Sequence, residues 1–162
     1  MEPIFLIVGP PAVGKSTTSH ALATRFTRSV HIPVDDLREM VVSGLLLPAP
    51  EWSDELTQQV SLARASAVQM AVNYRNAGFT VVIDDFWDED HLEDYQALFS
   101  YPHTHKIVLF PDQQVAHQRN LQRAGRDPAR GYIDEGIRIV YERLLEVAPR
   151  LSKEGWVVVD SS

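Results

Sequence analysis

The sequence contains no cysteine, which excludes disulfide bonds, thiolate zinc sites and cysteine nucleophiles. It has no apolar run near the roughly twenty residues that a bilayer span requires, and the first run, Ile4 to Val8, is too short for a signal peptide. A surplus of positive charge is also missing, because the formal net charge is -7, and this disfavours general binding to nucleic acid. We therefore expect a cytoplasmic protein that has no membrane partner.

The remaining composition is that of an ordinary globular protein, with 44% apolar and 23% charged residues, and the length predicts a single domain over residues 1–162. Short β-branched runs alternate with longer helical stretches, which predicts an α/β fold with a parallel sheet covered by helices on both faces. We expect its strands at Ile4–Val8, Val30–Val34, Phe79–Ile83, Lys106–Phe110 and Trp156–Val159. Pro33 cannot donate to a strand ladder, so the second of these strands belongs at an edge of the sheet.

The boundaries of two helices can be read from capping and breaking residues. One is expected from Asp54 to Ala77, with Ser53 as its N-cap and Gly78 as its end. The apolar residues that fall on one face of this helix are Leu56, Val60, Ala63, Ala67, Met70, Ala71 and Tyr74. The other helix is expected from Asp134 to Ala148, ended by Pro149, and its inward residues are Ile137, Val140, Tyr141, Leu144 and Leu145.

The strongest motif is a phosphate-binding loop directly after the first strand, where the chain satisfies the pattern G-x-x-x-x-G-K-[ST]. Its glycines let backbone N–H groups converge on phosphate oxygens, and the helix that follows adds its positive end. The lysine is expected to reach the β- and γ-phosphates, and the serine hydroxyl to coordinate magnesium. The pattern therefore predicts that ATP and Mg²⁺ are bound by Gly9, Pro10, Pro11, Ala12, Val13, Gly14, Lys15, Ser16 and Thr17.

Three classes of protein use such a loop. A motor or AAA-type ATPase needs more chain than 162 residues, with sensor elements after the core. A GTPase switch carries an Asn-Lys-x-Asp-like segment that reads guanine after the fourth strand, and the segment Phe110-Pro111-Asp112-Gln113 has no such pattern. A small kinase needs an acid near the acceptor hydroxyl, an acid for the metal and a mobile basic flap. The sequence favours the kinase because it supplies candidates for all three.

Two pairs of aspartates follow strands of the predicted sheet. Asp35 and Asp36 come after the second strand, where one of them can orient an acceptor hydroxyl and accept its proton, with Arg38 holding the acceptor or a transferring oxygen. Asp84 and Asp85 end the third strand as a Walker B segment does, and one of them is expected to reach magnesium. In each pair, capping of the next helix is the alternative role.

Arginines recur at helical spacing after the fourth strand, at Arg119, Arg123, Arg126 and Arg130. Guanidinium groups suit phosphate oxygens and can neutralise charge in a transition state. A solvated basic helix face is the alternative, but the rest of the protein is acidic. We therefore predict a helical lid over about residues 112–131, with Arg119 and Arg126 binding the nucleotide.

The phosphate-binding loop, the Asp35-Asp36-x-Arg38 group and the Arg119-Asn120-x-x-Arg123 segment together resemble the small P-loop kinases. This AAA-domain-like kinase family includes the 5′-hydroxyl polynucleotide kinases and the chloramphenicol phosphotransferases, and the resemblance covers most of the chain. It implies a three-layer P-loop NTPase fold whose five-stranded parallel sheet has the order 2-3-1-4-5. It also implies that Asp35 is the general base and that Arg123 is the lid arginine, so that Lys15, Asp35, Arg38 and Arg123 form the catalytic set.

An apolar loop lies beside the expected acceptor side, a helical region over about residues 36–77. Residues 44–52 read Gly-Leu-Leu-Leu-Pro-Ala-Pro-Glu-Trp, a segment that either packs or lines an apolar pocket, and Phe86-Trp87 follow the metal acids. This composition favours transfer of the γ-phosphoryl group to a hydroxyl of a small molecule, with nucleic acid disfavoured as acceptor. A 5′-hydroxyl polynucleotide or nucleoside kinase is the alternative. A nucleotide-binding regulatory protein without productive transfer is the alternative of another class.

Overall fold

A computed structural model describes residues 1–49, 51–124 and 129–162 of the chain. Its centre is a five-stranded parallel sheet with the order β2-β3-β1-β4-β5, which confirms the predicted topology. The strands are β1 (Ile4–Gly9), β2 (Ser29–Pro33), β3 (Thr80–Phe86), β4 (Thr104–Leu109) and β5 (Trp156–Val159). Because β2 is an edge strand, Pro33 costs the sheet no internal hydrogen bond, as expected.

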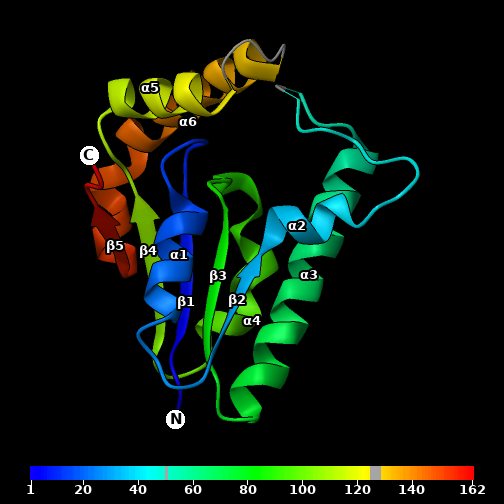
Figure 1. Cartoon of the computed structure of the whole chain (residues 1–162), viewed down its shortest axis with the longest axis vertical. Helices are drawn as coiled ribbons and strands as arrows, with labels where there is room; N and C mark the ends of the chain where they lie inside the picture. The colour runs from blue at the N-terminus through cyan, green and yellow to red at the C-terminus, as the bar shows by residue number, and fades with distance from the viewer. Residues whose placement is uncertain (50, 125–128) are drawn as a thin grey trace.

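Helices cover both faces of the sheet, so the fold has three layers (Figure 1). They are α1 (Lys15–Ala23), α2 (Val34–Glu39), α3 (Asp54–Asn76), α4 (Gln96–Phe99), α5 (Gln113–Ala124) and α6 (Ala129–Leu151), with 3-10 turns η1 (Glu89–Tyr95) and η2 (Ser152–Glu154). Alternate residues of β1 serve opposite cores: Leu6 packs with α3, while Ile7 packs with residues of α1, α5 and α6. Among the described residues, none of the helices has the length and apolarity of a membrane span.

The long helix α3 follows its predicted boundaries. The Ser53 hydroxyl accepts from the Leu56 N–H at 3.1 Å, and Gly78 adopts a φ of +82° just beyond the C-cap. The prediction that Tyr74 is inward is wrong, because its ring packs edge-on against Phe79 near the surface and 38% of the residue is exposed. The buried face contains Arg64 instead, a position that hydropathy alone does not assign to a core.

Helix α6 is longer than predicted at both ends. It continues through Pro149 to Leu151, because a proline in the last turn removes only one backbone bond before the helix ends. Leu145 is 63% exposed, so its inward placement is wrong: it follows Leu144 by a rotation of about 100° and turns away from the core. Leu151 is buried near the end of the helix.

The phosphate-binding loop begins at Gly9, where the backbone of β4 lies close to β1. A Cβ atom on Gly9 would lie 2.5 Å from the Leu109 carbonyl oxygen, a backbone atom that cannot rotate away. On its other side, the Gly9 carbonyl accepts a hydrogen bond from the Trp87 N–H at 3.0 Å. Gly9 is therefore fixed between two neighbouring chain segments at the carboxyl edge of the sheet.

We expect Gly9→Ala to lower the free energy of unfolding by about 1–3 kcal/mol, because the added methyl group overpacks against backbone. Urea unfolding would measure the change. Gly131→Ala is the matched control, since a Cβ there meets no atom within 4 Å. Equal unfolding midpoints for Gly9→Ala and the wild type would show that β1 and β4 accommodate the added methyl group without loss of stability. That result would contradict this account.

Candidate functional site

The phosphate-binding loop connects β1 to α1 through two left-handed residues. Ala12 has a φ of 60° and Gly14, the N-cap of α1, a φ of 89°. The turn brings the Lys15 ammonium back over the loop, where it donates to the Pro10 carbonyl at 2.8 Å. Burial lowers the pKa of Lys15, and nearby carboxylates, Asp35 foremost, oppose that change. The ammonium is thus a poorly solvated cation whose present partner is a neutral carbonyl.

Asp84 lies on the face of β3 that is turned toward α1. Its Oδ1 accepts from the Ser16 hydroxyl at 3.0 Å, and its Oδ2 contacts Nε2 of His31 on β2. Asp84 is only 4% exposed. A hydroxyl and a carboxylate side by side are the two protein oxygens with which a P-loop site holds magnesium.

Asp85 lies on the opposite face of β3 because successive side chains of a strand alternate. It is buried, and it accepts hydrogen bonds from Arg64 Nε at 2.6 Å, from the Tyr95 hydroxyl at 2.7 Å and from the Phe86 N–H at 2.8 Å. Burial raises the pKa of the Asp85 carboxyl, while the charge of Arg64 and the Tyr95 hydroxyl oppose that rise. The geometry therefore favours Asp84 as a metal ligand, a choice that the sequence left open.

Arg64 joins three elements through this buried charge cluster. Besides Asp85 it contacts Asp88 at 2.9 Å and Asp94 at 3.4 Å, both through NH1. Burial alone would lower the pKa of Arg64, but the charge of Asp85 and the hydrogen bond that Arg64 donates to Asp88 raise it above its usual range. Its guanidinium also lies 5.0 Å from the centroid of the Phe86 ring. The sequence signal for this role was an arginine one turn from Val60 and Ala67, inside an apolar helix face.

The residues predicted to bind the acceptor lie where β2 passes into α2. Asp35 is open to solvent, with 61% of its side chain exposed, and one of its oxygens accepts from Arg38 NH1 at 3.0 Å. The Arg38 side chain is itself buried and lies 5.9 Å from the centroid of the Phe86 ring. Asp36 is exposed. Of the two aspartates, Asp35 is therefore the one that Arg38 holds in place.

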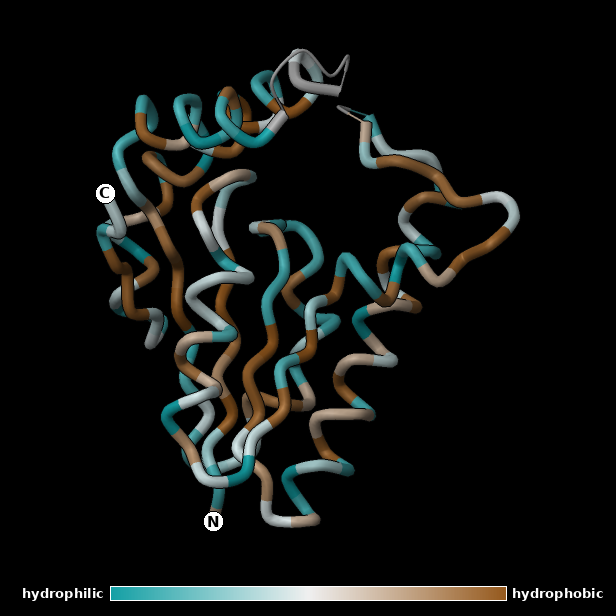
Figure 2. The backbone as a smooth tube through the Cα atoms, viewed as in Figure 1, coloured by the Kyte–Doolittle hydropathy of each residue, from teal (hydrophilic) through white to brown (hydrophobic). Residues whose placement is uncertain are grey.

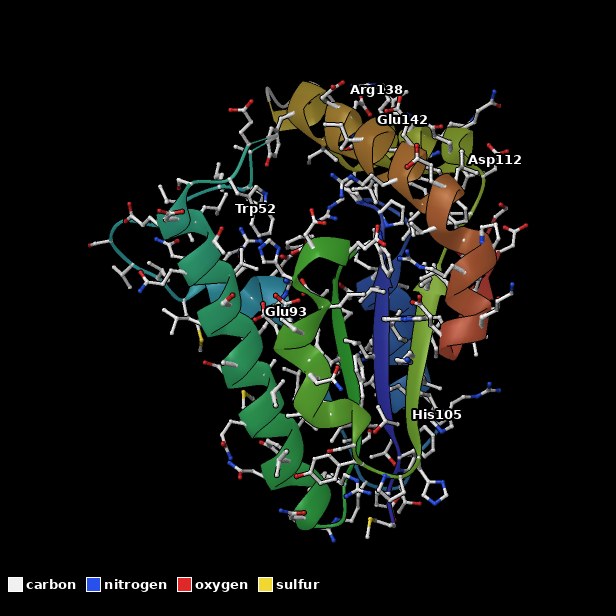
Figure 3. All side chains as sticks on the ribbon, turned by 180° about the vertical axis from the view of Figure 1, so that it is seen from behind. Trp52, Glu93, His105, Asp112, Arg138 and Glu142 are labelled. Atoms are coloured by element: carbon white, nitrogen blue, oxygen red, sulfur yellow. The ribbon has the colours of Figure 1, made fainter. Side chains whose placement is uncertain are left out.

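Aromatic rings form a wall beside Asp35. Trp52 stacks on His91 with 5.2 Å between centroids and 7° between planes, and it meets Phe86 edge-on at 5.9 Å. His91 in turn contacts Asp88, which connects the wall to Arg64. Figure 3 shows Trp52 between the N-terminal end of α3 and the carboxyl ends of the strands. The aromatic wall, Trp52, Phe86 and His91, is thus fixed by the charge cluster behind it.

The apolar loop before Trp52 does not pack into the core. Val42 is 97% exposed and Leu47 73%. Gln59 of α3 holds the loop by accepting from the Leu46 N–H at 3.0 Å and donating to the Gly44 carbonyl at 2.7 Å. Figure 2 shows this hydrophobic segment projecting away from the sheet.

Helices α5 and α6 lie across the carboxyl edge of the sheet, above the phosphate-binding loop (Figure 1). Arg119 donates to the carbonyls of Val13 at 3.1 Å and Ser161 at 2.9 Å, so it contacts the loop directly. Arg123 is exposed, and its charge contributes to the lowered pKa of Lys15. Arg126 lies outside the described residues, as does the side chain of Arg130. Of the four arginines, Arg119 and Arg123 are therefore placed near the loop.

The donor set suits magnesium better than a transition metal. Among the described residues, no group of three or more acidic or histidine side chains gathers as a ready-made metal cage. Magnesium does not need one, because it usually keeps several waters and takes one or two protein oxygens together with phosphate oxygens. The Ser16 hydroxyl and the Asp84 carboxylate, 3.0 Å apart, fit that requirement.

Comparison with known proteins supports the kinase-like fold. Residues 4–159 match a family model described as an AAA domain. A search of curated proteins found no match. Three similar solved structures are a tunicamycin resistance protein from Deinococcus radiodurans (19% identity, TM-score 0.63), a sugar kinase from Janibacter sp. (17%, 0.67) and a shikimate kinase from Bacteroides thetaiotaomicron (16%, 0.59). The alignments cover 99%, 99% and 98% of this chain and 86% of each of those chains. At these identities the likeness shows the fold, which is that of P-loop kinases, as the sequence predicted.

We expect Arg64→Met to lower the free energy of unfolding by about 3–5 kcal/mol, because the carboxylates that share its charge stay buried without a counter-ion. The control is Arg138→Met. Arg138 also contacts two carboxylates, those of Glu135 and Glu142, but these contacts lie at the surface. The unfolding midpoint of this control should match the wild type. Chemical denaturation of the three proteins is the measurement, and equal losses for both variants would contradict a structural role for the Arg64 cluster.

Proposed function

This chain belongs to the AAA domain family, and on that premise we propose that it is a kinase which transfers the γ-phosphoryl group of ATP to a hydroxyl of a small molecule. One observation carries the proposal. Asp35, an exposed carboxylate held by Arg38, is the carboxylate that most opposes the fall in the pKa of the partly buried Lys15. An acid for the acceptor and a cation for the phosphates are thus within electrostatic reach of each other at the carboxyl edge of the sheet.

In this proposal each residue has a separate task. Backbone N–H groups of residues 9–17 bind the phosphates, and Lys15 exchanges the Pro10 carbonyl for phosphate oxygens. Ser16 and Asp84 hold Mg²⁺, which neutralises phosphate charge when bound. Asp35 accepts the proton of the acceptor hydroxyl while the oxygen of that hydroxyl forms a bond to the γ-phosphorus. The bond from that phosphorus to the bridging oxygen breaks, and ADP leaves with the electron pair.

The lid of a single domain that spans residues 1–162 is the segment over about residues 112–131, whose described parts are α5 and the first residues of α6. Arg123 stabilises charge on the transferred group, while Arg119 and Arg126 hold the nucleotide. The contacts of Arg119 with the phosphate-binding loop support this assignment for the described part of the lid. A cytoplasmic location, where ATP is available, is part of the same proposal.

The acceptor is a compact, partly apolar hydroxyl compound bound within about residues 36–77 and the aromatic wall. The wall offers ring faces and edges, and the cations against it, Arg38 and Arg64, are already paired with carboxylates. A polynucleotide end would bring its own phosphates to a wall whose neighbouring arginines are already paired, which disfavours it. Stacking on Trp52 keeps a nucleoside acceptor as the second candidate. A regulatory protein without transfer is the candidate of another class.

The proposal is tested by incubating the protein with ATP, Mg²⁺ and a panel of hydroxylated metabolites and antibiotics, with a 5′-hydroxyl oligonucleotide alongside. Phosphorus NMR distinguishes a phosphomonoester product from inorganic phosphate. We expect at least one small alcohol to become phosphorylated and the oligonucleotide to be a poor acceptor. Efficient labelling of the oligonucleotide alone would favour the polynucleotide kinase, and nucleotide binding with no transfer at all would favour the regulatory protein.

Lys15→Ala should abolish turnover without lowering stability, because the partly buried ammonium of the free protein donates to a neutral carbonyl rather than to an ion-pair partner. Thermal unfolding with and without ATP and Mg²⁺ is the measurement. The variant should unfold no earlier than the wild type and lose the stabilisation that the nucleotide gives. Retention of that stabilisation would show that Lys15 does not meet the phosphates.

Asp35→Asn should reduce transfer by about 100-fold or more, since the amide cannot accept the acceptor proton. Its affinity for ATP should be unchanged because Asp35 stands on the acceptor side. The control is Asp36→Asn, which changes the neighbouring exposed aspartate. Transfer is measured with the acceptor found in the panel, and affinity by calorimetry. A loss of ATP affinity as large as the loss of rate would assign Asp35 to the nucleotide instead.

A further inference from the structure

His31 has a position that the proposed reaction does not explain. It lies on the edge strand β2, opposite Val82 in the parallel register, and its Nε2 contacts Oδ2 of Asp84. Its side chain is 16% exposed, so the ring is largely enclosed. The other oxygen of the same carboxylate accepts from the Ser16 hydroxyl at 3.0 Å. The two oxygens of Asp84 are thus held from two different elements, β2 and α1.

We propose that His31 is a positioning residue of the metal site, which fixes the Asp84 carboxylate for a divalent cation. This inference rests on the proposed function. A carboxylate can rotate about the bond to its Cβ atom, and Ser16 alone restrains one of its two oxygens. His31 restrains the second, so Oδ1 stays beside the hydroxyl with which it shares the cation. Ligating carboxylates are commonly held by such hydrogen bonds, and the loss of one weakens metal binding about 10- to 100-fold.

Charge balance supports the same role. Asp84 is 4% exposed, and the cations nearby have other partners: Lys15 donates to the Pro10 carbonyl, and Arg64 serves Asp85 on the far face of β3. A hydrogen-bond partner at Oδ2 compensates the burial of that carboxylate oxygen, which the Ser16 hydroxyl on Oδ1 does not do. His31 supplies that partner without bringing a permanent positive charge to a cation site, as an arginine in its place would.

The neighbouring histidine provides a matched control. His20 of α1 lies next to His31, with 6.1 Å between ring centroids in an edge-to-face arrangement. His20 is exposed, and in the described part of the chain the histidine that contacts Asp84 is His31. Replacing His20 therefore removes a neighbouring imidazole that does not contact the Asp84 carboxylate.

The test measures Mn²⁺ binding to the complex with a non-hydrolysable ATP analogue by electron paramagnetic resonance, which requires neither turnover nor an acceptor. We expect His31→Phe to weaken Mn²⁺ binding about 10-fold or more. His31→Gln should retain most of the affinity, since its amide nitrogen reaches near the place of Nε2, and His20→Phe should match the wild type. Affinity for the analogue without metal, measured by calorimetry in EDTA, should be the same in all four proteins.

Thermal unfolding identifies any variant that does not fold, and His31→Asn replaces His31→Phe in that case because its shorter amide cannot reach Oδ2. Wild-type Mn²⁺ affinity in the variant that lacks the contact would overturn the inference, and so would a loss in His31→Gln as large as in His31→Phe. In both results the proposed function stands, because the wild-type complex binds metal. A wild-type protein that binds no Mn²⁺ with the analogue would overturn the proposed function and this inference together.

Discussion

Successive side chains of a β-strand point to opposite faces of the sheet, and the organisation of the site depends on this rule at the end of β3. Asp84 and Asp85 are neighbours in sequence, yet one meets Ser16 and His31 on the side of α1, and the other meets Arg64 and Tyr95 on the side of α3. A single strand end thereby serves two purposes. In the proposed reaction one carboxylate binds the cation at the phosphate-binding loop, while the other is bonded in the core to Arg64 and Tyr95.

The buried hydrogen bonds of Arg64 connect the sheet to α3 and to the segment that leads into η1. Arg64 belongs to α3, Asp85 to β3, and Asp88 to the segment that leads into η1, so its bonds tie three elements together. Phe86 lies near the guanidinium groups of both Arg64 and Arg38, and Arg38 holds Asp35. Phe86 therefore lies between the buried Arg64 cluster and the Arg38–Asp35 pair. Because the charges of the Arg64 cluster are buried, their loss costs far more than the loss of surface pairs such as those of Arg138.

The sequence predicted the phosphate-binding loop, the edge strand with Pro33 and the boundaries of α3, because each rests on local chemistry: a contiguous motif, a missing donor, a cap. Long-range partners left little such signal. Nothing local says that His31 reaches Asp84. Arg64 lies one turn from Val60 and Ala67 on the apolar helix face, but hydropathy placed Tyr74 on the core face instead. The choice between Asp84 and Asp85 was available in principle from strand alternation, but it required the strand to continue to Phe86, and the predicted strand ended at Ile83. The inward placement of Leu145 was wrong for a related reason, since one step along a helix turns a side chain out of the core.

The division of labour between the two aspartates is the central claim of this account, and it is tested most directly by titrating Mn²⁺ into Asp84→Asn and Asp85→Asn, each bound to a non-hydrolysable ATP analogue. The titration is followed by electron paramagnetic resonance, with the folded fraction of each variant determined by circular dichroism. The account predicts that Asp84→Asn stays as folded as the wild type and loses Mn²⁺ affinity, whereas Asp85→Asn unfolds more readily and keeps wild-type affinity in its folded fraction. Loss of Mn²⁺ affinity in folded Asp85→Asn, with affinity retained in Asp84→Asn, would contradict it.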